Sequence, residues 1–443
     1  MASKPVDLFL APTVESLEED KYVIATYIMG ASREADILSR AATVGLEQTT
    51  GSWARVPGET DEVRKRSAGR VVGVYSVPDY ESRGSIPADV ALRWYVVRIA
   101  FPWVNFYDNL PLLMSTVIGN ISAMDNLKLV DLDFPAGYLA QFQGPRFGVR
   151  GVRDLINVPE RPILNNMIKP CTGITPEEGA KIFYRAAVGG TDWIKDDELM
   201  GASPAFSRLE ERVMAYMEAG KRADLEKGQT TLYSVNITDN QDRILSNALR
   251  AIDAGANALM VNIFWAGFSV VKQLSEDPRI TVPLMIHNCG SGAMVANPVG
   301  GFSSVVGAKL SRLAGADVFL DYVPTMKFGG IEEKFQRIAQ VCLAPMRSIK
   351  PTMVHVGGGV TPGIVPYLMD LLGNDIAIGA GAGIHTHPAG PAAGAKALRD
   401  AIDARMQAIS LEKAAESSPE LKTALDTWGT FGSEKMKSLF NLT

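Results

Sequence analysis

Cysteine and histidine are scarce in this sequence, which contains three Cys and four His among 443 residues. The cysteines, Cys171, Cys289 and Cys342, lie far apart and form no CxxC pair. Their number and spacing exclude a disulfide framework and a zinc site recognisable from spacing, and they are typical of a protein in a reducing compartment. We therefore expect a cytoplasmic protein.

The sequence also lacks a long apolar run and an excess of basic residues. Its longest apolar run, residues 258–271, is interrupted by Asn262 and is too short to span a bilayer. The N-terminus lacks the basic segment and apolar core of a targeting signal. The formal net charge is −5, with Lys and Arg dispersed, so neither nucleic acid nor a membrane is an expected partner. Small soluble substrates are the expectation.

Apolar residues are plentiful, at 47% of the chain, and this is enough for a large core and two domains. Residues 1–137 combine alternating strand-like runs with helical stretches. This combination predicts an N-terminal α+β domain of ferredoxin-like type with an antiparallel sheet. The strand-like runs are residues 22–28, 69–75 and 94–100, and the helical stretches are residues 33–45 and 110–118.

From residue 163 the pattern changes to a repeated alternation of short strands and helices. Eight Val/Ile/Leu-rich runs predict strands at residues 163–170, 191–198, 230–238, 258–264, 283–288, 317–321, 352–357 and 376–379. Amphipathic stretches predict helices at residues 176–188, 207–222, 243–254, 305–313, 332–342 and 363–372. This repetition predicts a (β/α)8 TIM barrel over residues 138–415, with a helical tail over residues 416–443. A doubly wound open sheet is the competing fold, but it rarely needs eight parallel strands, and no GxGxxG follows the first one.

The most informative stretch is Gly-Gly-Thr-Asp-Trp-Ile-Lys-Asp-Asp-Glu at residues 189–198. Because side chains alternate along a strand, Lys195 and Asp197 point to one side and Asp196 to the other. If the first side is the barrel interior, Glu198 can fold back beside them. A buried lysine that captures CO₂ becomes a carbamate with two carboxylate-like oxygens, so Lys195, Asp197 and Glu198 could together hold one Mg²⁺ ion. The alternative for this stretch alone is a solvated acidic loop that caps the next helix.

The carboxyl ends of the predicted strands are unusually polar, and barrel enzymes carry their chemistry there. The residues at these ends are Lys169, Lys195 to Glu198, Asn236, Asn262, His287, Asn288, Asp321 with Lys327 in the next loop, and the glycine-containing runs 357–359 and 381–383. Glycine-rich ends on the last two strands predict a phosphate site lined by bare backbone N–H groups. Taken singly, Lys169 would be an ordinary surface lysine and His287 a core histidine. Because they converge with the acidic cluster, we interpret both as acid/base groups.

Taken together, these residues resemble the large chain of RuBisCO over essentially the whole sequence. The matching motifs are Glu47-Gln-Thr-Thr-Gly-Ser-Trp53, Gly119-Asn120, Ile168-Lys-Pro170, residues 189–198, Ile286-His287, Lys327, Gly381 and His387-Pro388. The resemblance implies that Lys195 is carbamylated and binds Mg²⁺ with Asp197 and Glu198. It also implies that Lys169 abstracts a proton, that His287 acts as an acid/base group, and that Lys327 lies on the mobile loop six.

The same resemblance implies a homodimer, because four residues of the N-terminal domain would reach the active site of a neighbouring subunit. These residues are Glu47, Ser52, Trp53 and Asn120. One phosphate site is retained by the resemblance, in Ser52, Trp53, Lys327, Gly358, Gly359, Gly381 and Ala382. Glycine is the family residue at the last of these positions.

The second phosphate site departs from the family pattern. Asn288 stands where the family has an arginine, and Ser291 and Leu320 stand where it has histidines. Charge-assisted contacts contribute about 1.5–3 kcal/mol each, so the loss of several predicts that a bisphosphate is not bound usefully. Cys171 also replaces the second lysine of the family's Lys-Pro-Lys motif, and Gly357 replaces a serine. The chain thus resembles the form IV RuBisCO-like proteins rather than a carbon-fixing carboxylase.

This resemblance implies an enzyme that forms a Mg²⁺-stabilised enolate of a substrate with one phosphate. The reaction expected first is decarboxylation of a 3-oxo sugar-acid phosphate of the 3-oxo-isoapionate 4-phosphate type, because Cys171 removes a cation that would hold the carboxylate. One alternative is an enolase or isomerase of a ketose or diketo phosphate, as in methionine salvage, which is a weaker match at the strand-one lysine. Another is a non-catalytic regulatory protein, which would need none of these buried charges.

Overall fold

The computed structural model describes residues 6–18, 20–51, 55–324, 327 and 330–440. The chain forms two compact units. The first unit contains Met1–Phe142 with Gly290–Leu310, and the second contains Gln143–Cys289 with Ser311–Thr443. The domain limits predicted from the sequence, at residues 137 and 415, stay predictions.

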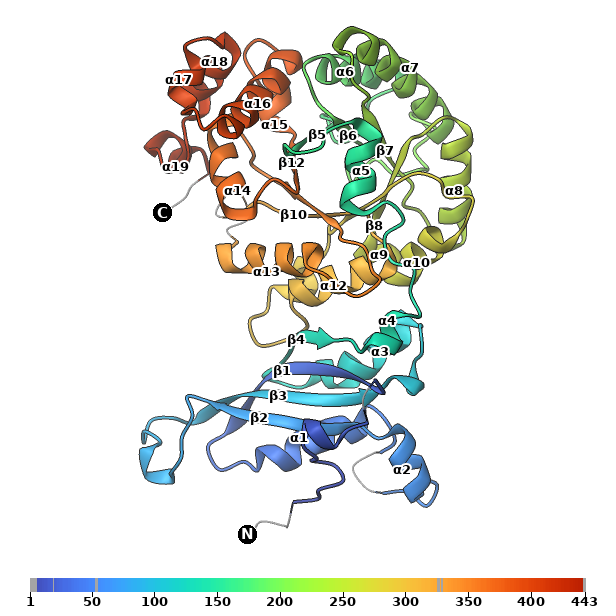
Figure 1. The fold of residues 1–443 in the computed structure, drawn as a ribbon, viewed down its shortest axis with the longest axis vertical. Helices are drawn as coiled ribbons and strands as arrows, with labels where there is room; N and C mark the ends of the chain where they lie inside the picture. Colours follow the sequence, from blue (N-terminus) through green and yellow to red (C-terminus); the bar gives the residue numbers. More distant parts are fainter. Residues whose placement is uncertain (1–5, 19, 52–54, 325–326, 328–329, 441–443) are drawn as a thin grey trace. The chain divides into compact units, whose positions relative to one another are not determined.

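The first unit contains a four-stranded antiparallel sheet in the order β2-β3-β1-β4, and this architecture confirms the α+β prediction (Figure 1). Its strands are β1 (Tyr22–Ser32), β2 (Arg70–Val77), β3 (Leu92–Pro102) and β4 (Leu127–Asp133). Alternate side chains of β1, including Ala25, Tyr27 and Met29, are fully buried, so one face of the sheet contributes the core of this unit. The strand β4 is hard to recognise in the sequence because Lys128 and Asp131 interrupt its apolar pattern.

Helices of the first unit are α1 (Ile37–Glu47), α2 (Asp61–Ser67), α3 (Leu110–Ile118), α4 (Ala136–Leu139) and α11 (Gly292–Val295). Short 3₁₀ helices occupy Val14–Ser16, Arg83–Ser85, Trp103–Asn105 and Asn120–Ala123. The helix predicted at residues 33–45 starts later because Asp36 caps it, accepting a hydrogen bond from the backbone N–H of Ser39.

In the second unit, eight parallel strands close into a barrel in the order β5-β6-β7-β8-β9-β10-β11-β12, so the TIM-barrel prediction is confirmed (Figure 1). The strands are β5 (Ile163–Met167), β6 (Trp193–Lys195), β7 (Leu232–Asn236), β8 (Ala258–Asn262), β9 (Leu284–His287), β10 (Val318–Tyr322), β11 (Met353–Gly357) and β12 (Ile376–Ala380). The strand predicted at residues 191–198 is shorter than expected, because the chain turns at Asp197, whose carbonyl accepts a hydrogen bond from Met200.

Helices follow the strands and surround the barrel. They are α5 (Gly148–Ile156), α6 (Pro176–Val188), α7 (Leu209–Lys227), α8 (Gln241–Asp253), α9 (Ile263–Ala266), α10 (Phe268–Glu276), α12 (Ser304–Ala314), α13 (Glu332–Leu343), a 3₁₀ turn at Pro362–Ile364 with α14 (Val365–Leu372), α15 (Ala382–His385), α16 (Pro391–Met406), α17 (Leu411–Ala415), α18 (Pro419–Trp428) and α19 (Glu434–Phe440). The helix α6 begins where predicted because Thr175 and Glu178 form a capping box with Pro176 at the first helical position.

Apolar side chains fill the barrel interior near the amino ends of the strands. Trp193, Met285 and Val318 belong to this core cluster, together with Val152 and Ile156 of α5. Because side chains alternate along each strand, residues two positions further on also point inward, now toward the carboxyl ends. The packing of the core therefore directs polar residues of the next layer into the barrel mouth.

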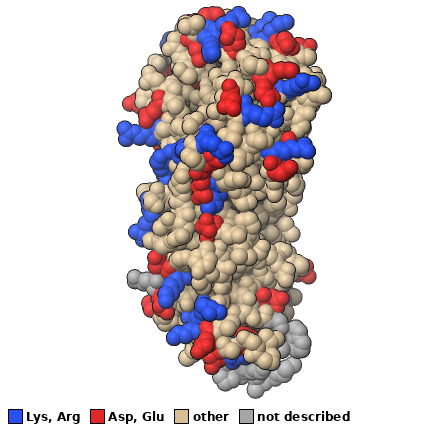
Figure 2. Space-filling view, turned by 90° about the vertical axis from the view of Figure 1, so that its right-hand side faces the viewer, with Lys and Arg blue, Asp and Glu red and all other residues tan. Residues whose placement is uncertain are grey.

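Among the described residues, no helix is long and apolar enough to cross a membrane. On the face that Figure 2 presents, Lys and Arg side chains are interspersed with Asp and Glu. That mixture agrees with the dispersed charge of the sequence.

Candidate active site at the carboxyl ends of the barrel strands

Lys195 lies two residues beyond Trp193 on β6 and is fully buried. Its ammonium group donates a hydrogen bond to the carbonyl of Asp196 (2.9 Å) and lies 3.7 Å from a carboxylate oxygen of Glu198. Burial lowers the pKa of Lys195, although the charges of Glu198 and Asp197 oppose this effect. A buried amine with a lowered pKa is the form of lysine that can react with CO₂.

The neighbouring carboxylate of Asp196 points away from the mouth, as the alternation of the strand predicts. It accepts hydrogen bonds from the guanidinium of Arg212 (3.2 Å), the hydroxyl of Tyr233 (2.8 Å) and the backbone N–H of Asn236 (3.0 Å). Burial raises the pKa of Asp196, and Arg212 opposes that rise. Asp196 therefore joins β6 to α7 and β7, and its oxygens are committed to these donors.

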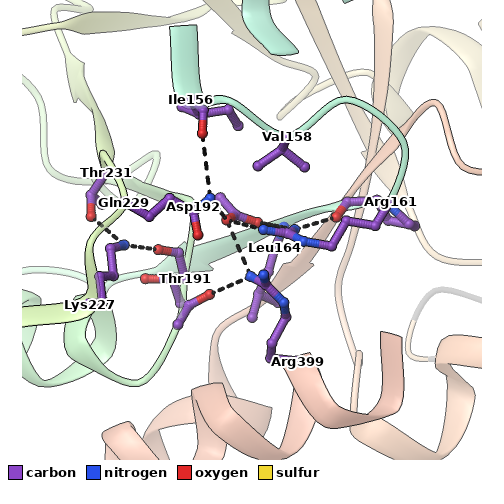
Figure 3. Close-up of polar contacts among 12 residues, drawn as sticks. Ile156, Val158, Arg161, Leu164, Thr191, Asp192, Lys227, Gln229, Thr231 and Arg399 are labelled. Carbon is purple, nitrogen blue, oxygen red and sulfur yellow. Dashed lines mark hydrogen bonds and ion pairs between the residues drawn. The ribbon is translucent and has the colours of Figure 1, made fainter. Parts of the chain in front are cut away.

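A second outward-facing carboxylate, Asp192, anchors the start of β6 (Figure 3). Arg161 donates to its two oxygens, each at 2.6 Å, and Gln229 and the backbone N–H of Leu164 donate at 2.8 Å. Arg399 approaches from α16 at 3.4 Å. Asp192 and Asp196 thus hold the strand from both ends on its outer side, which leaves Lys195 on the inner side.

Lys169, which follows β5, reaches the residues of the β6 turn. Its ammonium donates to Asp197 Oδ2 (2.6 Å) and to Cys171 Sγ (2.9 Å). Burial acts to lower the pKa of Lys169, but the hydrogen bonds to Asp197 and Cys171 outweigh it and raise the pKa. A Cβ atom at Gly381 would lie 3.1 Å from Lys169 Cε, so the first residue after β12 passes close to this lysine.

His287, at the end of β9, completes the cluster. Its Nε2 lies 3.2 Å from Glu198 Oε2, and its Nδ1 accepts a hydrogen bond from the backbone N–H of Cys289 (3.0 Å). These contacts assign the ring proton to Nε2, which donates to Glu198. Burial and the charge of Lys195 lower the pKa of His287, whereas the hydrogen bond to Glu198 opposes this effect. Burial opposes ionisation of Glu198, but His287 and Lys195 outweigh it and hold its pKa low.

These contacts bring together five residues that the sequence singled out, namely Lys169, Lys195, Asp197, Glu198 and His287. Within the described part of the chain, no group of three or more His, Cys, Asp or Glu side chains is placed to hold a metal ion. Two carboxylates beside a buried lysine become a set of three hard oxygen ligands only if the lysine carries a carbamate. Such a set fits Mg²⁺.

The glycines predicted to bind phosphate lie at the ends of the last two strands. Gly358 and Gly359 follow β11 with φ values of 97° and 98°, a conformation that favours glycine. Gly381 and Ala382 follow β12, and α15 begins at Ala382. The methyl group of Ala382 is exposed, so it does not fill the interior.

Other predicted site residues differ in their surroundings. Asn288 is buried, and its amide donates a hydrogen bond to Asp321 Oδ1 (2.6 Å). Lys327 is exposed, whereas residues 325–326 and 328–329 beside it are outside the described residues. Ser52 and Trp53 are also outside the described residues.

Glu47 and Asn120 belong to the first unit, where both line one hollow of about 680 Å³. Gln48, beside Glu47, joins the two segments. Its side chain donates to the carbonyls of Ser115 and Thr116, each at 2.9 Å, and accepts from the N–H of Ile121 at 3.4 Å. The two predicted residues are therefore held in one local site.

Two histidines near the mouth, His355 (buried) and His385 (partly buried), were not among the predicted site residues. His355 of β11 points into the barrel, where its Nε2 lies 3.0 Å from Asn165 Oδ1, and burial lowers its pKa strongly. His385 of α15 has its Nε2 3.0 Å from Asn166 Nδ2, and burial lowers its pKa to about 4. The signal for His355 is its position two residues before Gly357, on the inward side of the strand.

Comparison with known proteins agrees with this arrangement. Residues 148–428 match the catalytic domain of the ribulose bisphosphate carboxylase large chain, and residues 14–138 match its N-terminal domain. The chain is 48% identical over 404 residues to a ribulose bisphosphate carboxylase-like protein of Archaeoglobus fulgidus, covering 91% of this chain and 92% of that one. It is 36% identical over 411 residues to a 2,3-diketo-5-methylthiopentyl-1-phosphate enolase of Bacillus licheniformis, covering 92% and 98%.

Among solved structures, the octameric ribulose-1,5-bisphosphate carboxylase/oxygenase of Pyrococcus horikoshii has a TM-score of 0.84 at 32% identity, covering 95% of this chain and 96% of that chain. Both units of the chain thus have counterparts in one family. The chain belongs to the RuBisCO large-chain family, as one of its RuBisCO-like proteins.

Proposed function

We propose that this protein forms an enolate from a carbonyl substrate that carries one phosphate. The observation that carries the proposal is the 2.6 Å contact between the Lys169 amine and Asp197 Oδ2. This contact puts a group that can move a proton beside a cluster of oxygen ligands. Asp197, Glu198 and the carbamate of Lys195 would hold Mg²⁺. When bound, Mg²⁺ would stabilise the negative charge that develops on the substrate oxygens.

In this proposal Lys169 moves the proton at the reacting carbon. His287 donates its Nε2 proton to Glu198 and so orients that carboxylate. Gly358, Gly359, Gly381 and Ala382 bind the phosphate through backbone N–H groups. Asn288 and Leu320 supply no cation for a second phosphate, and Asn288 is already paired with Asp321. These features support a monophosphate substrate and oppose carboxylation of ribulose bisphosphate.

For the reaction type, we propose an enolase or isomerase acting on a diketo or ketose phosphate. The relatives at 36% and 34% identity that are named 2,3-diketo-5-methylthiopentyl-1-phosphate enolases support this choice. Decarboxylation of a 3-oxo sugar-acid phosphate is the second candidate. The observation that favours it is the Cys171 side chain 2.9 Å from the Lys169 amine, because a second lysine at this position would add a cation that retains a carboxylate.

A non-catalytic role is the proposal that the site supports least. Lys195 and Asp197 are at most 3% exposed, and burial of charged groups costs free energy that a scaffold would have no reason to bear. For the assembly, we propose a homodimer in which Glu47, Ser52, Trp53, Asn120 and Lys327 contribute to substrate binding. The hollow lined by Glu47 and Asn120 supports this arrangement.

Incubation with three kinds of substrate in D₂O, with Mg²⁺ and bicarbonate present, tests the reaction type. The panel contains a diketo phosphate, a ketose phosphate and a 3-oxo sugar-acid phosphate. We expect solvent deuterium to enter the diketo or ketose phosphate without release of CO₂. Release of CO₂ from the 3-oxo acid alone would replace the isomerase assignment by the carboxy-lyase one. Formation of phosphoglycerate from ribulose bisphosphate and CO₂ would contradict the whole proposal.

A further inference from the structure

Glu198 lies in a turn beyond the end of β6, where no strand ladder holds its backbone. Its side chain reaches His287 on β9, whereas its main chain leaves β6. The turn itself is closed by two local hydrogen bonds, from Met200 N–H to the Asp197 carbonyl (3.0 Å) and from Leu199 N–H to Asp197 Oδ1 (3.2 Å). Neither of these two bonds holds the backbone carbonyl of Glu198.

Two asparagine side chains from the next two strands contact this turn. Asn262, the last residue of β8, donates its amide to the Glu198 carbonyl at 3.0 Å. Asn236, the last residue of β7, donates to the carbonyls of Asp197 (3.3 Å) and Glu198 (3.2 Å). The Glu198 carbonyl therefore accepts from two side chains on two strands.

Other contacts also hold Asn236 and Asn262 in place. Asn236 is fully buried, its N–H donates to Asp196 Oδ2 and its Oδ1 accepts from the N–H of Thr238. Asn262 is 7% exposed and pairs in register with His287, whose ring contacts the Glu198 carboxylate. Asn262 therefore holds the Glu198 carbonyl, and its neighbour His287 on β9 holds the Glu198 carboxylate.

Burial of the side-chain oxygen of Asn262 is energetically unfavourable. Among the described residues, no donor lies within hydrogen-bond distance of its buried Oδ1. A buried acceptor without a donor is unfavourable, and an apolar residue of the same shape would avoid the loss. The favourable contact that this amide does make is the hydrogen bond from its Nδ2 to the Glu198 carbonyl.

We infer that Asn262, assisted by Asn236, is a positioning residue that fixes the metal-binding turn. It acts through Glu198 rather than by contact with the substrate. The inference rests on the proposed function in one respect only, namely that Glu198 is a metal ligand. Residues that orient metal ligands in this way typically change metal affinity by about 10- to 100-fold when they are replaced.

Asn257, the residue before β8, is a matched control. It accepts a hydrogen bond from the N–H of Tyr233 (2.7 Å) and donates to the Thr231 carbonyl (3.0 Å). It thus links strands as Asn262 does, but at the opposite end of the barrel. A purely structural role would make Asn257→Leu and Asn262→Leu equivalent.

The test combines two measurements on wild type, Asn262→Leu and Asn257→Leu. The first is amide hydrogen exchange of residues 199–200 without metal. The second is Mn²⁺ affinity with bicarbonate present, followed by electron paramagnetic resonance. We expect Asn262→Leu to speed exchange in the turn and to weaken Mn²⁺ binding about 10- to 100-fold. Asn257→Leu should lower the melting temperature without either effect, and Asn262→Ala replaces Asn262→Leu if that variant does not fold.

Mn²⁺ affinity within twofold of wild type in the Asn262 variants would overturn the inference, as would equal losses in the Asn257 variant. If the wild type itself shows no bicarbonate-dependent Mn²⁺ binding, the proposed function fails on its own. The amide exchange rates of Leu199 and Met200 then show whether Asn262 positions the turn. Faster exchange in Asn262→Leu supports the positioning role, and unchanged exchange contradicts it.

Discussion

At the scale of single residues, the adjacent side chains of Lys195 and Asp196 lie on opposite sides of the barrel wall and make different contacts. Lys195 is buried on the inner side of β6 beside Glu198, whereas Asp196 is neutralised by Arg212 on the outer side. The alternation of a strand accounts for this division, and it could be read from the sequence.

Replacing Lys195 tests whether a carbamate is needed. Lys195→Ala should lose metal affinity and activity together, because Asp197 and Glu198 alone are two ligands where three are required. Lys195→Arg keeps a positive charge but cannot form the carbamate, so it should fail equally. Titration with Mn²⁺ in the presence and absence of bicarbonate measures the metal affinity of each variant. A wild-type affinity that does not depend on bicarbonate would refute the need for a carbamate.

Other residues of the site could not be predicted singly. His385 contacts Asn166 across 219 residues of sequence, and nothing local in either segment indicates that they meet. His355 lies within an apolar strand, where its inward direction depends on the register of the barrel. By contrast, Lys169 lies just after β5 and His287 ends β9, and strand ends meet at the barrel mouth whatever the register.

At the scale of elements, the three-residue strand β6 depends on anchors outside its own ladder. Asp192→Asn should destabilise the protein by about 3 kcal/mol, because it leaves the paired guanidinium of Arg161 without its counter-charge in a buried site. Asp403→Asn is the matched control, since Asp403 pairs with Arg399 at 3.4 Å but is half exposed. Urea unfolding gives both values, and similar losses in the two variants would count against the anchoring role.

The end of α7 predicts a pH dependence of stability. Lys227 donates to the Thr191 carbonyl (2.6 Å) and to Thr231 (2.7 Å), and burial lowers its pKa to about 8 (Figure 3). The unfolded chain therefore binds this proton more readily than the folded chain between pH 8 and roughly 10.4. The unfolding free energy should rise through that window.

A shift of this size corresponds to roughly 3 kcal/mol of unfolding free energy. The measurement is the difference in stability between wild type and Lys227→Met at pH 8 and pH 10. Below pH 8 this gain in unfolding free energy is absent. It should be present in full above the pKa that Lys227 has in the unfolded chain. A difference that stays constant across the window would show that Lys227 titrates normally.

Elements themselves were predictable to different degrees. The bounds of α6 follow from its capping box, and the eight barrel strands follow from apolar runs bounded by turns. The strand β6 is shorter than its run, because the chain turns at Asp197 and the side chains of Asn236 and Asn262 bind the Glu198 carbonyl within this turn. Such tertiary bonds override local preference.

At the scale of the whole molecule, the proposed site needs two subunits. Asn120→Ala and Lys195→Ala should each abolish activity, but mixing the two variants should restore intact sites at about a quarter of positions, because each heterodimer of a two-fold assembly regenerates one. Mixing Lys195→Ala with Lys169→Met should restore nothing, since both changes affect the same barrel. Equal recovery in both mixtures, or none in the first, would contradict the shared site.

Solvent deuterium exchange tests whether Lys169 moves a proton next to a carbamate-dependent metal site. The measurement is the rate at which D₂O labels 2,3-diketo-5-methylthiopentyl-1-phosphate or a 3-oxo sugar-acid phosphate, followed by NMR. We expect labelling that requires both Mg²⁺ and bicarbonate and that slows by about 10²- to 10⁴-fold in Lys169→Met, with metal affinity kept. Labelling that is indifferent to Mg²⁺, to bicarbonate or to Lys169 would contradict it.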